Sequence, residues 1–172
     1  ALAQVDGRVV AFLEPIALYM TKDLYEEKDG QWQFAYPPPG ETIALGEGHV
    51  YDPTAGDLTL LTFANGLHMS LRAARVLRDK HGVRARGVDL RWLNPLNEAF
   101  ILEQAKATGK ALVVDESRRT GGLGEAILAL IHENLGGSGV ARRLNALDTF
   151  IPLGAAANLV IPQEADVVRC AL

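Results

Sequence analysis

The clearest pattern in the chain is an apolar run, 111–114, followed by a polar turn and an amphipathic stretch. The apolar run predicts a strand buried on both faces. Asp115 and Glu116 stand at the predicted carboxyl end of this strand, and the glycine-rich residues 117–122 predict a turn. Apolar residues then recur at helical spacing, at Leu123, Ile127, Leu130 and Ile131. The pattern predicts a strand–turn–helix unit, and ligands and partners of open α/β sheets gather at the carboxyl ends of such strands.

The alternation of strands and helices continues on both sides of this unit. Glycines follow two of the predicted helices directly, as Gly82 and Gly109, where glycine is typical of a C-cap. This alternation predicts an α/β fold, namely a mostly parallel open sheet with helices on both faces. Strands are predicted at 57–63, 83–90 and 140–144, and helices at 67–80, 97–108 and 163–172.

The beginning of the chain follows a different pattern. Residues 1–7 are typical of a helix end that runs into a turn, and residues 8–13 predict a strand that stops before Pro15. Residues 23–40 are polar and then proline-rich, as in interdomain linkers. We therefore expect a fragment of a larger polypeptide. Its expected division is the tail of a preceding domain at 1–22, a linker at 23–44 and the α/β domain at 45–172.

Composition narrows the class of protein. A hydrophobic fraction of 48% is enough for a packed core, and a formal charge of -4 gives no electrostatic reason to expect nucleic acid or an anionic membrane as a partner. No apolar run reaches the roughly 20 residues that a membrane span needs. The single cysteine, Cys170, excludes an internal disulfide and favours a cytoplasmic location. In the predicted last helix, Cys170 is expected to act as a small buried apolar residue.

The glycines of the turn raise the question of a phosphate site. Gly121, Gly122 and Gly124 precede a helix, where backbone amides can bind phosphate. The dinucleotide fingerprint, however, would require glycine at Ile127, and no P-loop Gly-Lys-Ser/Thr follows. We therefore predict that the glycines permit a tight turn and close packing of the helix on the sheet.

The candidate catalytic residues do not form a set. Asp115 and Glu116 are adjacent on a strand, so their side chains point to opposite faces, and one of them is expected to cap the following helix or to pair with an arginine. Ser117 lacks the G-x-S-x-G context of a hydrolase nucleophile. His68, in the first turn of a predicted helix, is expected to be solvated or capping, and the four histidines have no metal-ligand spacing. We assign no catalytic, cofactor-binding or metal-binding residue.

Several segments nevertheless resemble one enzyme family in register. Residues 10–19, Val-Ala-Phe-Leu-Glu-Pro-Ile-Ala-Leu-Tyr, resemble the end of the pyrimidine-binding domain in the β subunit of thiamine-diphosphate-dependent 2-oxoacid dehydrogenases. Four further segments resemble successive motifs of the transketolase C-terminal domain, namely residues 57–66, 88–96, 113–116 and 121–124. Asp148-Thr149 with Pro152 resembles the region near the end of that domain. The resemblance extends over essentially the whole chain.

This resemblance implies a transketolase C-terminal-like fold and a place in the E1 component, as a separate β subunit or part of a fused α–β chain. In that family thiamine diphosphate and magnesium are bound by segments that this chain lacks, so the resemblance implies a scaffold and interface domain that is inactive alone. Its implied partners are the remaining E1 domains or subunit, a second copy in a homo-oligomer, and the acyltransferase core. Some β subunits hold a monovalent cation at the position of Asp6, but Arg8 replaces one ligand, and the site is not claimed.

Two alternatives stay open at the level of sequence. The first is a fragment of a transketolase or deoxyxylulose-phosphate synthase, which would transfer ketol groups between sugars. The second is a non-enzymatic α/β module that binds a ligand at Gly121–Gly124. Under the family interpretation, the exposed turn Ser117–Thr120 is the segment expected to form a subunit interface.

Overall fold

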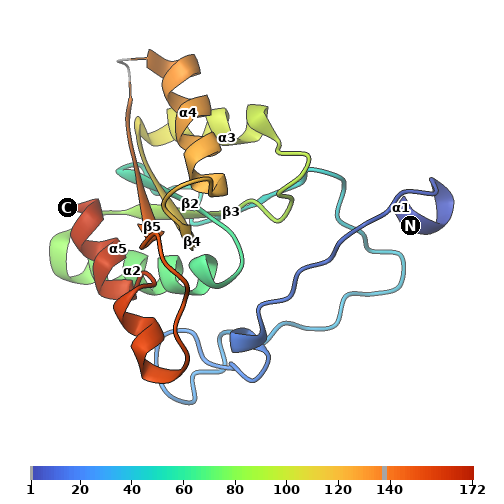
Figure 1. Cartoon of the computed structure of the whole chain (residues 1–172), viewed down its shortest axis with the longest axis horizontal. Helices are drawn as coiled ribbons and strands as arrows, with labels where there is room; N and C mark the ends of the chain where they lie inside the picture. Colours follow the sequence, from blue (N-terminus) through green and yellow to red (C-terminus); the bar gives the residue numbers. More distant parts are fainter. Residues whose placement is uncertain (1, 137–138) are drawn as a thin grey trace.

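The computed structural model describes residues 2–136 and 139–172, which form a five-stranded sheet flanked by helices (Figure 1). The strand order is β1-β3-β2-β4-β5. Strands β2 to β5 run parallel, while β1 pairs antiparallel with β3 at one edge. This confirms the predicted mostly parallel open sheet. The strands are β1 (His49–Tyr51), β2 (Leu58–Thr62), β3 (Ala85–Asp89), β4 (Lys110–Arg118) and β5 (Val140–Ala146).

The four longest helices lie where the sequence pattern predicted helices, whereas the 3-10 helices were not predicted. Gly82 and Gly109 end α2 and α3 with φ of +68° and +66°, the left-handed conformation that glycine adopts without strain. Among the helices of the described residues, none combines the length and apolar character that crossing a membrane requires. The α-helices are α1 (Leu2–Val5), α2 (Asn65–His81), α3 (Glu98–Thr108), α4 (Leu123–Leu135) and α5 (Glu164–Ala171), and the 3-10 helices are η1 (Ile16–Leu18) and η3 (Gly154–Leu159).

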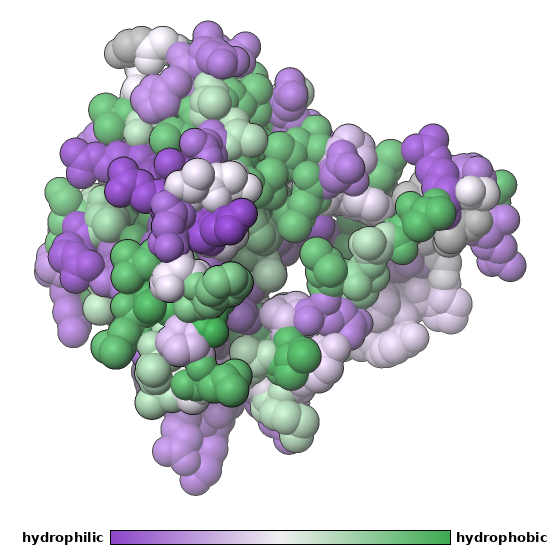
Figure 2. All heavy atoms as spheres, in the orientation of Figure 1, coloured by the Kyte–Doolittle hydropathy of each residue, from purple (hydrophilic) through white to green (hydrophobic). Residues whose placement is uncertain are grey.

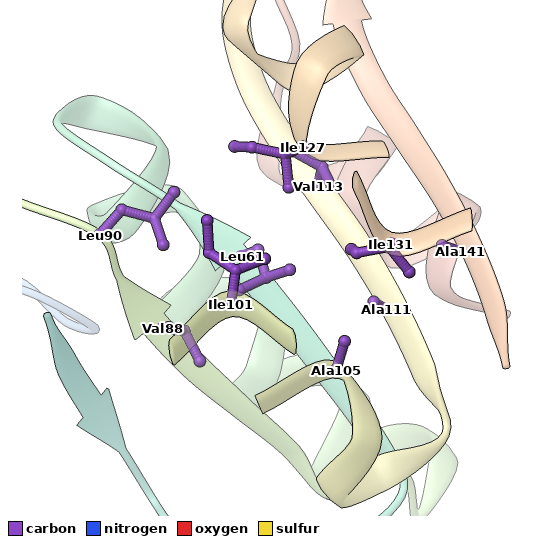
Figure 3. Packing of buried hydrophobic residues seen from close by; sticks show 10 residues of the cluster. All are labelled: Leu61, Val88, Leu90, Ile101, Ala105, Ala111, Val113, Ile127, Ile131 and Ala141. Carbon is purple, nitrogen blue, oxygen red and sulfur yellow. The ribbon is translucent and has the colours of Figure 1, made fainter. Parts of the chain in front are cut away.

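The two faces of the sheet are covered by different helix pairs. On one face, α3 and α4 pack Ile101, Ile127 and Ile131 against Leu61 and Val113, as Figure 3 shows. On the other face, α2 and α5 cover side chains of the opposite parity on the same strands, such as Leu60 and Leu112. Because successive strand residues point to opposite faces, each central strand contributes to both cores. Cys170 packs at the margin of the α2–α5 core, in agreement with the apolar role predicted for it.

Two features of the sheet differ from the prediction. Strand β4 continues to Arg118, so Asp115 and Glu116 lie within the strand and the turn begins after it. The reason is β5, which runs alongside this extension and pairs Asp115 with Asn145, with a register shift before Arg118. Strand β1 was not predicted, because three residues that pair at an edge leave almost no periodic signal.

The predicted strand at 8–13 is wrong. These residues form no regular element, and Val9, Phe12 and Leu13 are largely exposed. A β-branched segment becomes a strand only when another strand offers a ladder, and the described part of the chain pairs none with it. The first half of the polar and proline-rich segment 23–40 packs on the domain. Its residue Leu24 is buried against Leu67 and Leu71 of α2.

Candidate functional site

The turn between β4 and α4 is organised by the carboxylate of Asp115. This side chain is 1% exposed and points to the α4 face of the sheet, the same face as Val113. Its oxygens accept hydrogen bonds from the Ser117 amide at 2.8 Å, the Ser117 hydroxyl at 2.7 Å and the Gly124 amide at 2.8 Å. The α4 N-cap, Gly122, has no side chain to supply. Asp115 therefore caps α4 from within β4, which confirms the capping role predicted for one of the two carboxylates.

The glycines of the turn make room for this carboxylate. A Cβ atom on Gly124 would lie 3.1 Å from the Asp115 Oδ2 and 3.3 Å from the Asn145 Nδ2. On Gly122 it would lie 2.2 Å from the Ser117 hydroxyl oxygen. The amides of Gly124 and Gly121 already donate to Asp115 and Glu125, respectively. The predicted packing role is confirmed, and these two amides already have protein acceptors in place of a phosphate.

Glu116 faces the opposite side of the sheet and has a separate partner. It points toward α2, where the Asn65 amide donates a hydrogen bond to its carboxylate. Burial raises the pKa of Glu116, the Asn65 hydrogen bond opposes that rise, and the nearby Asp115 charge adds to it. Asp115 and Glu116 are thus separated by the strand itself, as their adjacency predicted, and they do not act as a carboxylate pair.

A second carboxylate, Asp148, fastens the turn to the loop after β5. It accepts hydrogen bonds from the Thr120 amide and the Thr120 hydroxyl, both at 2.7 Å. The Arg143 guanidinium on β5 donates to the Arg119 carbonyl at 2.6 Å. These contacts join residues 117–122 and 147–149 into one surface at the carboxyl ends of β4 and β5, which we call the clamped surface. The motif Asp148-Thr149 was visible in the sequence, but its partner Thr120, 28 residues earlier, was not.

The clamp between Asp148 and Thr120 is expected to open in acid. Hydrogen bonds from the Thr120 hydroxyl and amide hold the pKa of Asp148 below its ordinary value of 3.8. A depressed pKa means that the clamp's contribution is complete above about pH 4 and is lost as pH falls through the folded-state pKa. The Thr120 amide resonance should therefore shift in an acid NMR titration. In Asp148→Asn that step should disappear, and its persistence would show that another group controls the turn.

The clamped surface and the residues that follow it in the chain carry exposed apolar side chains. Phe150 is 96% exposed and Leu153 is 95% exposed, and Leu147, Ile151 and Leu159 are also exposed. In Figure 2, apolar atoms gather over the lower part of the molecule, where Figure 1 places η3, and along the N-terminal segment. Exposed apolar residues gathered in this way are typical of an interaction site.

The histidines do not converge on this surface. His68 is neither solvated nor capping, so that prediction is wrong. Its Nε2 lies 3.1 Å from the Asp23 carbonyl, and its ring meets Trp32 edge-on at 5.0 Å. The segment 22–34, which folds back onto α2, provides both contacts, and no local sequence pattern reveals such a return. His49 lies on β1 with its ring against Tyr51.

Comparison with known proteins relates most of the chain to one family. The family model described as "Transketolase, C-terminal domain" matches residues 46–167. The beta subunit of the pyruvate dehydrogenase E1 component of Bacillus subtilis is 31% identical over 168 residues, which cover 96% of this chain and 48% of that protein. The corresponding subunit of Staphylococcus aureus is 29% identical, over 93% of this chain and 46% of that protein. The chain thus spans about half the length of the curated relatives it matches.

Solved structures agree with this relation. A split-gene transketolase, described as an inactive beta4 tetramer, has a TM-score of 0.67 at 26% identity, over 77% of this chain and 42% of that one. A 2-oxoglutarate:ferredoxin oxidoreductase from Magnetococcus marinus has a TM-score of 0.50 at 12% identity, over 72% of this chain and 19% of that one. The second likeness shows the fold alone.

Proposed function

This chain belongs to the transketolase C-terminal domain family, and on that premise we propose that it is the C-terminal domain of a thiamine-diphosphate-dependent 2-oxoacid dehydrogenase E1 component. One observation carries the proposal. The similarity to pyruvate dehydrogenase E1 beta subunits covers 96% of the chain, so it includes the segment before residue 46, where the family model begins. A relation through the shared C-terminal domain alone would not require that segment to match.

The domain's proposed role is to position and bind rather than to carry out chemistry. In the intact enzyme, thiamine diphosphate and magnesium would supply the chemistry of 2-oxoacid decarboxylation. The residues described here do not fit that cofactor: the glycine turn is filled by Asp115 and Ser117, and the described residues contain no group of three or more His, Cys, Asp or Glu placed to hold a metal. Cofactor and metal are therefore assigned to the rest of the E1 component.

The clamped surface, together with residues 150–153 that follow it, is the proposed subunit interface. Residues 117–120, 147–151 and 153 are exposed, with Phe150 and Leu153 almost fully accessible, and Arg118 and Arg119 contribute two exposed positive charges. Desolvating such apolar side chains is the main driving force of obligate interfaces. The proposed occupant is the rest of the E1 assembly, including a second copy of the chain, with the acyltransferase core as a further partner.

A transketolase or deoxyxylulose-phosphate synthase remains the second candidate, because a split-gene transketolase is similar in structure over 77% of the chain. The reaction that the full-length protein catalyses distinguishes the two candidate functions. The full-length protein that contains this chain, supplied with thiamine diphosphate and magnesium, is expected to decarboxylate a 2-oxoacid with ferricyanide as electron acceptor. It should not convert ketose phosphates. The opposite result would establish the second candidate.

The 172-residue chain by itself is expected to be inactive in the same 2-oxoacid assay. The described residues do not fit the cofactor, and adding the chain to cofactor, magnesium and substrate should leave the rate at the uncatalysed level. The full-length protein, assayed in parallel, controls for substrate and acceptor. Detectable decarboxylation by the chain alone would contradict the scaffold role.

The interface is tested by placing charge on the apolar surface of the full-length protein. The double substitution Phe150→Asp with Leu153→Asp should convert the native oligomer to smaller species in analytical ultracentrifugation, since buried unpaired carboxylates oppose association. Val140→Asp is the matched control, because Val140 is also exposed but lies at the start of the β5 edge. An unchanged oligomer in the double variant, or an equal effect in the control, would place the interface elsewhere.

A further inference from the structure

A cavity of about 330 Å³ lies apart from the clamped surface, on the α2 face of the sheet. Three parts of the chain line it: α2, the sheet edge formed by β1 and β3, and the segment 22–34, which contacts α2. This volume lies at the lower end of the range for small-molecule sites. No part of the proposed E1 function uses it.

Aromatic side chains form the walls of the cavity. Trp32 and Phe34 meet edge-on at 5.5 Å on the side of the segment, and Tyr51 of β1 stands on the sheet side. The rest of the apolar lining includes Ala74 of α2 and Gly87 of β3, together with the larger Leu24 and Leu71. A cavity with aromatic and aliphatic walls suits a planar ring system, because aromatic rings stack and meet edge-on favourably.

The aromatic wall is held in place before any ligand arrives. Asp29 accepts hydrogen bonds from four backbone amides of the segment, those of residues 24, 25, 26 and 31. Asp23 accepts two more, from Lys28 and Gly30. The Arg72 guanidinium then ties the Leu24 carbonyl to Glu164 of α5, with both contacts at 2.6 Å. A preorganised wall lowers the cost of ordering the site on binding.

Guanidinium groups line the mouth. Arg75 is already paired with Glu26 and packs over the Tyr25 ring, but Arg78 and Arg84 have spare donors. The Arg78 Nε donates to Asp79 at 2.9 Å and the Arg84 Nε lies 3.9 Å from Asp57, while the terminal nitrogens of both make no hydrogen bond to the described residues.

The charges that face the cavity are three arginines and one carboxylate, Asp52, whose Oδ1 accepts the Thr54 hydroxyl. The spare donors of Arg78 and Arg84 can therefore bind an anionic group in the geometry that guanidinium favours.

We propose that this cavity binds a small planar aromatic molecule that carries one anionic group, with its ring against Trp32 and Phe34 and its anion on Arg78 and Arg84. An aryl carboxylate and a nucleoside monophosphate share this chemistry. The site is independent of the E1 assignment, because it rests on residues that the proposed interface does not include.

Tryptophan fluorescence tests the proposal directly. In the full chain with Trp92→Phe, Trp32 is the remaining tryptophan, and titration with 2-naphthoate should change its emission saturably at submillimolar concentration. Neutral 2-naphthamide should bind about tenfold more weakly, since it lacks the charge-assisted hydrogen bonds. Adenosine monophosphate, in a separate titration, distinguishes a nucleotide ligand from an aryl carboxylate. The absence of a saturable change with both anions at millimolar concentration would overturn the proposal.

Variants locate the binding. Arg84→Gln should weaken 2-naphthoate binding about tenfold and leave 2-naphthamide unchanged. Arg142→Gln, which alters an exposed arginine on β5, should change neither. Ala74→Leu should abolish binding by filling the cavity beside Ala74, with far-UV circular dichroism confirming the fold. Equal affinities for the two naphthalene ligands, or an unchanged affinity in Arg84→Gln, would overturn the assignment of the anion to these arginines.

Discussion

Replacing Asp115 by alanine is expected to lower the free energy of unfolding by about 3 kcal/mol. The carboxylate is buried and accepts three hydrogen bonds, from the Ser117 amide and hydroxyl and from the Gly124 amide. Alanine leaves the buried Gly124 amide and the part-buried Ser117 amide without an acceptor and removes the cap of α4. Urea unfolding followed by circular dichroism, extrapolated to water, measures the loss.

The neighbour of Asp115 supplies a matched control. Glu116→Gln should change the free energy of unfolding at pH 7 by less than about 1 kcal/mol, because burial already raises the pKa of Glu116 and so penalises its charge. Asp115→Asn should fall between the two, since one oxygen of the amide still accepts. If Asp115→Ala and Glu116→Gln had equal effects, the capping role of Asp115 would be refuted.

The second large effect is expected at the start of α2. A Cβ atom on Gly66 would lie 2.1 Å from the Thr62 hydroxyl oxygen and 3.2 Å from the Val114 carbonyl oxygen. The Thr62 hydroxyl donates to that same carbonyl at 2.8 Å, in the buried contact between β2 and β4. Gly66→Ala must displace this hydroxyl, and we expect a loss of about 2–3 kcal/mol in the free energy of unfolding, measured in the same way.

A double-mutant cycle separates this clash from general crowding. Thr62→Ala removes the atom nearest to the added methyl group, so Gly66→Ala should cost at least about 1 kcal/mol less in that background than in the native one. Additive effects of the two substitutions would show that the Val114 carbonyl, and not Thr62, excludes a side chain here. In either outcome the free energies report how closely α2 approaches Thr62 of β2 and Val114 of β4.

Sequence reasoning was accurate where the signal was local and periodic. The apolar stripe at Leu123, Ile127 and Ile131, the glycine caps at Gly82 and Gly109, and the opposed faces of Asp115 and Glu116 all depend on spacings within one element. The class of fold followed from the order of such elements. Those features are set by short-range sterics and by the side-chain periods of helix and strand.

Features that depend on contacts between residues distant along the chain could not be predicted from the sequence. Residues 8–13 have the composition of a strand but find no ladder in the described structure, while β4 extends to Arg118 because β5 lies beside it. The return of segment 22–34 onto α2, which places Trp32 against His68, likewise has no local signal.

The strand–turn–helix unit at 111–131 contains both kinds of feature, some determined by the sequence and some decided by the tertiary structure. The sequence alone determined that a strand, a glycine turn and an amphipathic helix follow one another, and that the glycines do not match a phosphate fingerprint. Only the tertiary structure decided that Asp115 caps α4 and that Asp148 holds Thr120, since each contact joins residues from different elements. The physical reason is that a hydrogen bond between distant residues forms only after the sheet has brought their backbones together.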